Sequence, residues 1–283
     1  WTITDKGDVA LHYIIGLDIG TSSVKGVLVS EDGTEKTTGK VEFVYTCRED
    51  GGIEIEAETY IGACFSLLRR LAAALPANGI LRGISAASAS GNLLLLDEDG
   101  RPSTPIFNWQ DSRVGEEARH LLGQVDIEAL YDKTGWPFDY KTFPLAMLCW
   151  IKCHRPDLLI HASKVCMSTE YLVYRLTGRW GLSTSAGSPF YLLDQRTGGY
   201  NRELLDIIGI GEGQLPPVGK AGAVPKEQGQ GIGLHLGLDP LQVQGEEGSI
   251  LVYDLSPGHI HHHVGPPGGI DQVVLHTVAG GEA

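Results

Sequence analysis

Residues 13–29 read YIIGLDIGTSSVKGVLV, two apolar runs separated by a glycine and three hydroxyl side chains. An apolar run of this length, bounded by turn residues, is typical of a buried strand. Because only the short turn from Gly20 to Ser23 separates the runs, we predict a hairpin of two buried strands. The acidic turn Asp32-Gly33 follows, and residues 40–45 alternate well enough to form a third strand.

The turn between the two runs carries the first candidate site, formed by Asp18, Gly20, Thr21 and Ser22. Glycine lets the backbone approach a phosphate closely, hydroxyls and backbone amides can donate hydrogen bonds to it, and a carboxylate can hold Mg²⁺ through water. The plain alternative is a hairpin turn with an incidental aspartate. We therefore predict a phosphate and magnesium site, with Asp18 holding the metal through water, and keep the alternative open.

Beyond the hairpin, strand and helix patterns alternate. Residues 57–75 carry an apolar stripe at helical spacing that ends before Pro76, and residues 83–96 contain two short strand-like runs. Helical patterns dominate from about residue 112 to residue 180, which predicts a mostly helical insertion. Residues 189–194 then return to an apolar, strand-like run.

A second candidate site lies in residues 109–113, Trp-Gln-Asp-Ser-Arg, just after an apparent strand that begins near Pro105. An aromatic face, an amide, a carboxylate and a guanidinium suit a polyhydroxylated ligand, which needs apolar stacking together with several hydrogen bonds. The alternative is a helix start with Asp111 as its N-cap. On these residues alone, the two interpretations are equally good.

The composition restricts the partners. The 283 residues include 22 Lys and Arg against 35 Asp and Glu, a formal net charge of −13, which opposes attraction to nucleic acid or anionic lipid. No stretch reaches the ~18 apolar residues of a membrane span. The five cysteines include no C-x-x-C pair, which favours reduced thiols over a disulfide framework or a zinc site. We expect a cytoplasmic protein that acts on a neutral small molecule and has neither nucleic acid nor membrane as a partner.

Several motifs occur in an order that makes the chain similar to a known family. They are the run 15–25, LLLLDEDGRP ending at Pro102, WQDSR at 109–113, YLVYRLTG ending at Gly178, and Leu193-Asp194 followed by Leu204-Leu205 and Leu215-Pro216-Pro217. Each motif alone is loose, but chance does not readily place all of them in this order. The chain resembles the amino-terminal domain of the FGGY carbohydrate kinases, which include xylulose and glycerol kinases.

This resemblance implies an α/β fold with an RNase H-like, actin-type mixed sheet, flanking helices and a helical insertion. It also implies ATP and Mg²⁺ as cofactors, and a sugar or polyol substrate bound mainly by this half of the enzyme. Such kinases often self-associate, so a homodimer is a further expectation. The positions that match sugar-contacting positions of the family are Ser88, Ser90, Gly91, Asn92, Trp109, Gln110, Asp111 and Arg113.

One departure from the family concerns the general base. Family members usually carry T-D-x-S after the Leu-Thr-Gly helix end, and the resemblance assigns that Asp as the base; the alignment puts Ser183 at this position. A neutral hydroxyl is a poor base because its pKa lies far above the operating pH. Three explanations stay open: impaired catalysis, a displaced alignment, or another carboxylate such as Asp111 acting as a substitute.

The resemblance also suggests domain boundaries. Residues 1–12 form an N-terminal extension, residues 13–227 the FGGY-type sugar-binding domain, and residues 228–283 a Gly- and Pro-rich tail that could begin a divergent nucleotide-binding domain. Most of the second, nucleotide-binding half of the family is therefore expected to be missing from this chain. The histidines between His259 and His263 could bind a transition metal, although a solvated loop is the better interpretation.

These observations support three functional hypotheses. The first is an ATP-dependent carbohydrate kinase, present mainly as its sugar-binding half. The second is a truncated or catalytically impaired sugar-binding module without turnover of its own, which rests on the missing half and on Ser183. The third is a chaperone-like or cytoskeletal ATPase of the actin type, against which residues 109–113 and the helical insertion argue.

Overall fold

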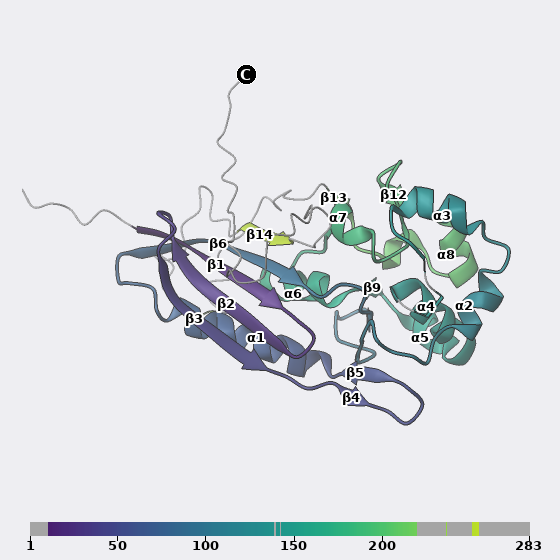
Figure 1. Ribbon diagram of the computed structural model, residues 1–283, viewed down its shortest axis with the longest axis horizontal. Coiled ribbons are helices and arrows are strands. Elements are labelled where there is room, and N and C mark those ends of the chain that lie inside the picture. Colours follow the sequence, from purple (N-terminus) through teal and green to yellow (C-terminus); the bar gives the residue numbers. More distant parts are fainter. Residues whose placement is uncertain (1–10, 139, 142, 220–235, 237–250, 255–283) are drawn as a thin grey trace, which may run out of the picture.

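The computed structural model describes residues 11–138, 140–141, 143–219, 236 and 251–254, and everything below concerns these residues. They form an elongated body in which a twisted sheet occupies one end and a group of helices the other (Figure 1). Within the described ranges, none of the helices combines the length and the hydropathy that a membrane span requires.

The main sheet has the strand order β14-β6-β1-β2-β3. Strand β1 pairs antiparallel with β2 and parallel with β6, and β6 also pairs parallel with β14, so the sheet is mixed as predicted. The bounds are β1 Leu11–Ile19, β2 Ser23–Ser30, β3 Glu35–Glu42, β6 Gly79–Ser88 and β14 Leu251–Asp254.

The first core lies between this sheet and helix α1 (Ala57–Ala72). Alternate residues of β1 point into it, because side chains along a strand alternate between the two faces; those buried are Tyr13, Ile15, Leu17 and Ile19. The helix lies directly on the strands, since a Cβ added at Gly26 would come within 2.8 Å of Leu71 Cδ1. Glycine at this position therefore permits the close approach of helix and sheet.

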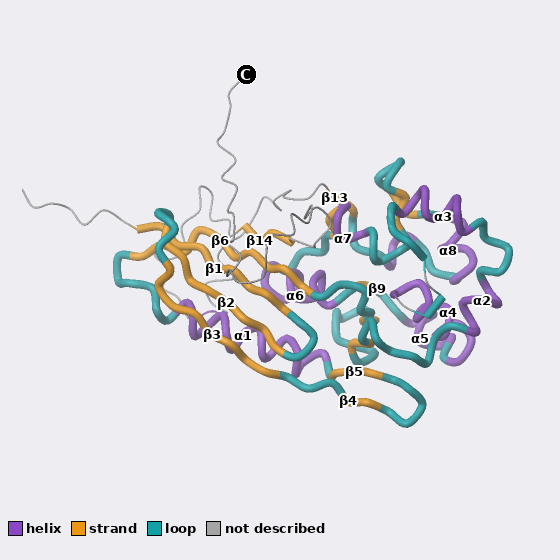
Figure 2. The backbone as a smooth tube through the Cα atoms, viewed as in Figure 1, coloured by secondary structure: helices purple, strands orange, loops and turns teal. Residues whose placement is uncertain are grey.

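The second core belongs to the helical end of the molecule, which Figure 2 shows as the purple segments away from the main sheet. Its helices surround buried side chains that α4 contributes along most of its length. The bounds of the helices are α2 Glu116–Leu121, α3 Ile127–Thr134, α4 Phe143–His154, α5 Pro156–His161, α6 Ser168–Thr177, α7 Thr184–Gly187, α8 Arg202–Ile208 and the 3-10 helix η1 Glu212–Gln214.

The remaining strands are short and pair outside the main sheet. Strands β4 and β5 form a hairpin that β8 extends, β7 pairs with β9, β10 with β13, and β11 with β12. The bounds are β4 Thr46–Cys47, β5 Ile53–Ile55, β7 Leu94–Leu96, β8 Ile106–Phe107, β9 Lys164–Cys166, β10 Leu182–Ser183, β11 Leu193–Asp194, β12 Gly199–Tyr200 and β13 Val218–Gly219.

Some sequence-based boundaries differ from the structure. The predicted strand 189–194 is reduced to β11, because Tyr191 adopts a positive φ of 64° that breaks an extended strand. The main sheet begins at Leu11, inside the predicted N-terminal extension. Strand β14 joins the sheet although it lies in the predicted tail, whereas the histidines at 259–263 lie outside the described residues.

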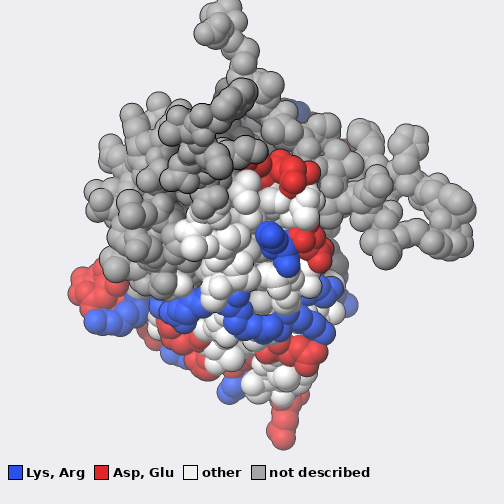
Figure 3. All heavy atoms as spheres, turned by 90° about the vertical axis from the view of Figure 1, so that its left-hand side faces the viewer, with Lys and Arg blue, Asp and Glu red and all other residues white. Residues whose placement is uncertain are grey.

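Charged side chains of both signs lie on the end of the molecule that carries the main sheet. On this face, Lys and Arg are interspersed with Asp and Glu, and neither sign covers it alone (Figure 3). A basic surface for nucleic acid would instead show one sign over an extended area. The expectation that nucleic acid is not a partner remains a prediction.

The cysteines separate into two groups by exposure. Burial raises the pKa of Cys64 and of Cys149 to about 12 and raises that of Cys166 as well, whereas Cys47 and Cys153 are exposed. Only the thiolate reacts readily with alkylating reagents. At mildly alkaline pH, iodoacetamide is therefore expected to label the folded chain at Cys47 and Cys153, and all five cysteines after denaturation. Peptide mass spectrometry would locate the labels, and rapid labelling of Cys64 in the folded chain would contradict the burial described here.

Candidate functional site

The predicted phosphate turn lies at the carboxyl end of β1. Within the turn, Gly20 donates its backbone N–H to the carbonyl oxygen of Ser23 at 2.9 Å, and the side chains of Thr21 and Ser22 are exposed. The Asp18 side chain is 67% exposed, and its nearest described cation is Lys25 Nζ at 3.9 Å. A carboxylate and two hydroxyls therefore face solvent together at this turn.

This donor set fits a magnesium ion that arrives with a nucleotide. Mg²⁺ usually keeps several waters and takes one or two carboxylates plus substrate phosphates, rather than a cage made only of protein groups. The described residues include no group of three His, Cys, Asp or Glu arranged to hold a metal. Asp18 is the carboxylate available at this turn for such an ion, and its role as a metal ligand remains a prediction.

A second loop reaches the same edge of the sheet. Strands β1 and β6 run parallel with Ile19 opposite Ser88, and the backbone N–H of Ala89 donates to the carbonyl oxygen of Ile19 at 2.8 Å. The loop that follows β6 therefore begins beside the phosphate turn. This pairing brings two of the predicted segments together, although they are far apart in the sequence.

The side chain of Asn92 has a structural role that the sequence did not reveal. Its Nδ2 donates to the carbonyl oxygen of Ala89 at 2.9 Å and to Ser168 Oγ at 3.0 Å, while its Oδ1 accepts from the backbone N–H of Ser168 at 2.7 Å. Ser168 Oγ in turn donates to Tyr60 at 3.0 Å. Both ends of the buried amide are thus occupied in tying the loop to the start of α6.

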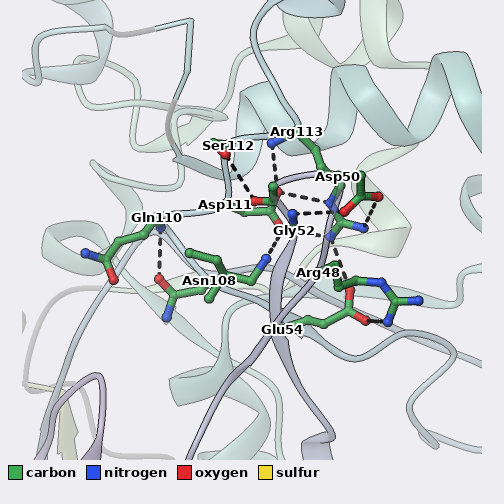
Figure 4. Close-up of polar contacts among 11 residues, drawn as sticks. Arg48, Asp50, Gly52, Glu54, Asn108, Gln110, Asp111, Ser112 and Arg113 are labelled. Atoms are coloured by element: carbon green, nitrogen blue, oxygen red, sulfur yellow. Dashed lines mark hydrogen bonds and ion pairs between the residues drawn. The ribbon is translucent and has the colours of Figure 1, made fainter.

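Asp111 and Arg113 form a buried ion pair (Figure 4). Asp111 Oδ2 accepts from Arg113 Nη2 at 2.7 Å and from the backbone N–H of Ile53 at 3.0 Å. Its Oδ1 accepts from the backbone N–H and the Nε of Arg113, both at 3.1 Å. The Asp111 side chain is 0% exposed and that of Arg113 8%. Each carboxylate oxygen therefore already accepts two hydrogen bonds.

Further carboxylates surround Arg113. Its Nη2 lies 3.2 Å from Glu54 Oε2 and its Nη1 3.8 Å from Asp50 Oδ2, and Glu54 also pairs with Arg48 at 2.5 Å. Burial opposes the charge on Arg113, but these ion pairs outweigh it and raise the pKa of the guanidinium above its usual value. Through this cluster, residues 109–113 are fixed to the β4–β5 hairpin.

A small cavity of about 10 Å³ lies between the loop after β6 and residues 107–114. This volume is close to that of one water probe, so a sugar can enter only if the walls move. Gly91 has a φ of 80°, and a Cβ there would meet Phe143 Cδ1 at 2.8 Å. The residues that line the cavity are Gly91, Leu93, Phe107, Asn108, Trp109, Asp111, Val114, Phe143 and Met147.

Trp109 and Gln110 present their side chains differently from Asp111. Trp109 is 38% exposed and also lines the cavity, so part of its ring is available for stacking. Gln110 is exposed; its backbone N–H donates to Asn108 Oδ1 at 2.9 Å, and its side chain points away from the ion-pair cluster (Figure 4). Of the predicted segment 109–113, these two residues and Ser112 are exposed, and Ser112 uses its hydroxyl to donate to the carbonyl oxygen of Gly51.

Ser183, the predicted position of the general base, caps a helix. It is the N-cap of α7, and its Oγ accepts from the backbone N–H of Ala186 at 3.1 Å and lies 3.1 Å from Ser185 Oγ. An oxygen in this arrangement satisfies an otherwise unpaired helix donor. These side-chain contacts of Ser183 are local, and they do not join it to Asp18 or to Asp111.

Replacing Ser183 with alanine tests the two interpretations of this residue. Loss of the cap is expected to cost about 0.5–1 kcal/mol of stability, measured by urea unfolding, with sugar affinity unchanged. A general base typically contributes about 10²–10⁴-fold to the rate. If the variant of a catalytically active form lost turnover by that factor at unchanged stability, the catalytic assignment would be correct and the capping role secondary.

Sequence reasoning missed two contributors to this region. Glu54 comes from the short strand β5, where nothing in the sequence marks it as a partner of Arg113. Phe143 carries a positive φ of 73°, which is strained for a bulky residue, and its ring closes the cavity above Gly91. The Pro144 that follows disfavours helical φ and ψ at Phe143, which is the one sequence signal of an unusual backbone there.

A larger, open hollow of about 880 Å³ lies elsewhere, on the side of the molecule formed by β11, β12 and residues 212–218. Trp180 and Tyr200 contribute aromatic surface, and Trp180 stacks on Tyr174 with ring centroids 4.1 Å apart. None of the residues predicted to bind sugar, phosphate or metal lines this hollow.

Comparisons with known proteins agree with the fold. The model of the protein family described as "FGGY family of carbohydrate kinases, N-terminal domain" matches residues 13–243. An autoinducer-2 kinase of Salmonella typhimurium strain LT2 is 30% identical over 234 residues, which cover 79% of this chain and 42% of the relative. A xylulose kinase of Lactococcus lactis is 28% identical over 210 residues, which cover 73% of this chain and 41% of the relative.

A solved structure of a carbohydrate kinase is also similar to this chain. The crystal structure of gluconate kinase from Lactobacillus acidophilus superposes with a TM-score of 0.77 and 25% identity, over 88% of this chain and 48% of that one. The chain thus spans less than half the length of these relatives.

Proposed function

Because the chain belongs to the FGGY family of carbohydrate kinases, matching its N-terminal domain, we propose that it forms the sugar-binding half of an ATP-dependent kinase that phosphorylates a hydroxyl of a sugar or polyol. The family match over residues 13–243 carries this proposal. The arrangement of the sheet edge supports it, because the phosphate turn and the loop after β6 begin side by side.

Different residues of this chain would have different roles in phosphoryl transfer, a reaction that depends mostly on positioning the reactants and on stabilising charge. Asp18 would hold the Mg²⁺ that accompanies ATP, through water, while Thr21 and Ser22 donate hydrogen bonds to phosphate oxygens. Magnesium supplies the positive charge that offsets the charge developing on the transferred group. Trp109 would stack on the sugar and Gln110 would hydrogen-bond to its hydroxyls.

Asp111 and Arg113 act in this proposal as positioning residues. A general base needs a free lone pair directed at the substrate hydroxyl. Each oxygen of Asp111 already accepts two hydrogen bonds, so the carboxylate is poorly placed to substitute for a missing base. The pair would instead set the position of residues 109–110 relative to the cavity. Asn92 would act similarly on the loop after β6, through Ser168.

Calorimetric titration of the purified 283-residue chain with a panel of ketoses and polyols, with and without ATP and Mg²⁺, tests the proposal. We expect saturable heat with at least one of them. A parallel assay of ADP release would separate a kinase from a sugar-binding module without turnover, which is the second hypothesis. No heat with any compound, from a chain shown to be folded by circular dichroism, would contradict the proposal.

Two expectations from the sequence remain proposals. A homodimer would be detected by sedimentation of the purified chain, as a mass of about twice the 30.4 kDa of one copy. A cytoplasmic location would be tested by fractionating cells that express the chain.

A further inference from the structure

The charges beside the cavity do not balance. The ion-pair cluster contains the carboxylates of Asp50, Glu54 and Asp111 and the guanidinium groups of Arg48 and Arg113, that is, three negative charges against two positive ones. Both guanidinium groups lie within 4.0 Å of a carboxylate of the same cluster. The cluster as a whole therefore carries one excess negative charge.

Arg113 has little capacity left for a ligand. Its Nε and Nη2 donate to Asp111, Nη2 is shared with Glu54, and Nη1 faces Asp50. Its side chain is only 8% exposed, so a ligand carboxylate could reach it only by displacing one of these partners. Arg48 is more exposed but is paired with Glu54 on the far side of the hairpin from Gln110 (Figure 4).

The cavity itself is lined by uncharged groups, with one exception. Asp111 is the charged residue among those that line it, and it is negative; the described lining residues include no Lys, Arg or His. Aromatic rings and the Asn108 amide complete the polar and apolar surface that a ligand would meet. The aromatic rings of such a wall can stack on the C–H face of a sugar, and the amide can form hydrogen bonds with its hydroxyl groups.

We propose that this pocket selects a neutral polyhydroxy substrate, a ketose or polyol, and discriminates against sugar acids of the same carbon skeleton. The inference rests on the proposed function and narrows it. A substrate carboxylate taken out of water needs a cation or several N–H donors, and leaving it unpaired beside excess negative charge is strongly unfavourable. On this point the chain would differ from a gluconate kinase, although it shares that protein's fold.

Matched pairs of ligands test the inference, because any sugar must first widen a cavity of about 10 Å³ and that cost is common to both members of a pair. Xylitol against D-xylonate and D-glucitol against D-gluconate differ mainly in charge, and D-xylulose and D-fructose extend the neutral set. In calorimetric titrations of the purified chain at low ionic strength, the neutral member of at least one pair is expected to bind about tenfold or more tightly than its acid.

A charge variant sharpens the test. Asp50→Asn removes the most exposed carboxylate of the cluster, at 57% exposure, and makes its net charge zero. The ratio of sugar-acid affinity to neutral-ligand affinity is expected to rise about two- to fivefold, and the neutral ligand serves as the reference for any change in the shape of the site. Asp157→Asn is the matched control. Asp157 lies on α5, is equally exposed at 57%, and pairs with Arg155, which is not a member of the cluster. Neither affinity should change in this variant.

The outcomes separate the inference from the proposed function. Tighter or equal binding of D-gluconate relative to D-glucitol, and of D-xylonate relative to xylitol, would overturn the inference and leave the sugar-binding function intact. Absence of binding by every compound, in a chain shown to be folded, would contradict the function and the inference together. An Asp50→Asn variant that weakened neutral and acidic ligands alike would show that the cluster acts by shape and not by charge, which would also overturn the inference.

Discussion

Replacing Asp111 with alanine is expected to lower the free energy of unfolding by about 2–4 kcal/mol, because it removes the closest negative charge beside a buried guanidinium together with the acceptor of four hydrogen bonds. Arg113, which is 8% exposed in the unaltered chain, would keep the weaker ion pairs with Glu54 and Asp50, and the backbone N–H of Ile53 would lose its acceptor. Urea unfolding followed by circular dichroism would measure the change.

Sugar affinity should fall in the same variant, since residues 109 and 110 would lose the side-chain part of their attachment to the β4–β5 hairpin and keep its backbone hydrogen bonds. Asp99→Ala is the control: Asp99 also pairs with an arginine, Arg101, but both side chains are well exposed, at 60% and 73%. An exposed pair of this kind contributes about 0–1 kcal/mol. Equal effects of the two substitutions would mean that the Asp111 pair does not hold the segment in place.

The second large effect is expected at Gly91. A Cβ at this position would come within 2.8 Å of Phe143 Cδ1 and 3.3 Å of Trp109 Cβ, and the φ of 80° is unfavourable for any residue with a side chain. Gly91→Ala should therefore destabilise the chain by about 1–3 kcal/mol. It should also reduce sugar affinity about tenfold or more, because the added methyl group occupies the cavity and a displacement of ~1 Å can cost ~10² in a positioned site.

Gly33→Ala separates backbone strain from crowding. Gly33 has nearly the same φ, 82°, but a Cβ there would have nothing within 4 Å. This control should lose about 1 kcal/mol of stability through the backbone alone and keep full sugar affinity. If Gly91→Ala bound sugar as well as the unaltered chain in the calorimeter, the cavity between Trp109 and Phe143 would not be the sugar site.

The hairpin of β1 and β2 could be predicted because its information is local. In β1 the buried residues alternate with exposed ones, and the turn at Gly20 lies next to the strands that it joins. Helix α1 was predictable for the same reason, since its apolar stripe and the Pro76 that follows are contiguous in the sequence. Patterns of this kind need no knowledge of distant contacts.

The roles of the site residues could not be predicted in the same way. Residues 109–113 stood out by composition, but whether Asp111 faces a sugar or an arginine depends on Ile53 and Glu54, which lie on another strand. Asn92 was proposed as a sugar ligand, and only its contacts with Ser168, on a helix distant in sequence, show that its amide is already occupied. Hydrogen-bond partners that are remote in sequence decide such roles, and a single sequence does not contain them.

Strand β14 has a consequence for the growing chain on the ribosome. Strands β1, β2 and β3 can pair as soon as they emerge, because each follows its neighbour in the sequence. Strand β6 is different: one of its edges pairs with β1, but the other waits for residues 251–254 to be synthesised. Until then its backbone N–H and C=O groups form an open template to which a strand of another molecule can add. A nascent chain of this protein is thus exposed to such pairing from the emergence of β6 until that of β14, along this edge of β6.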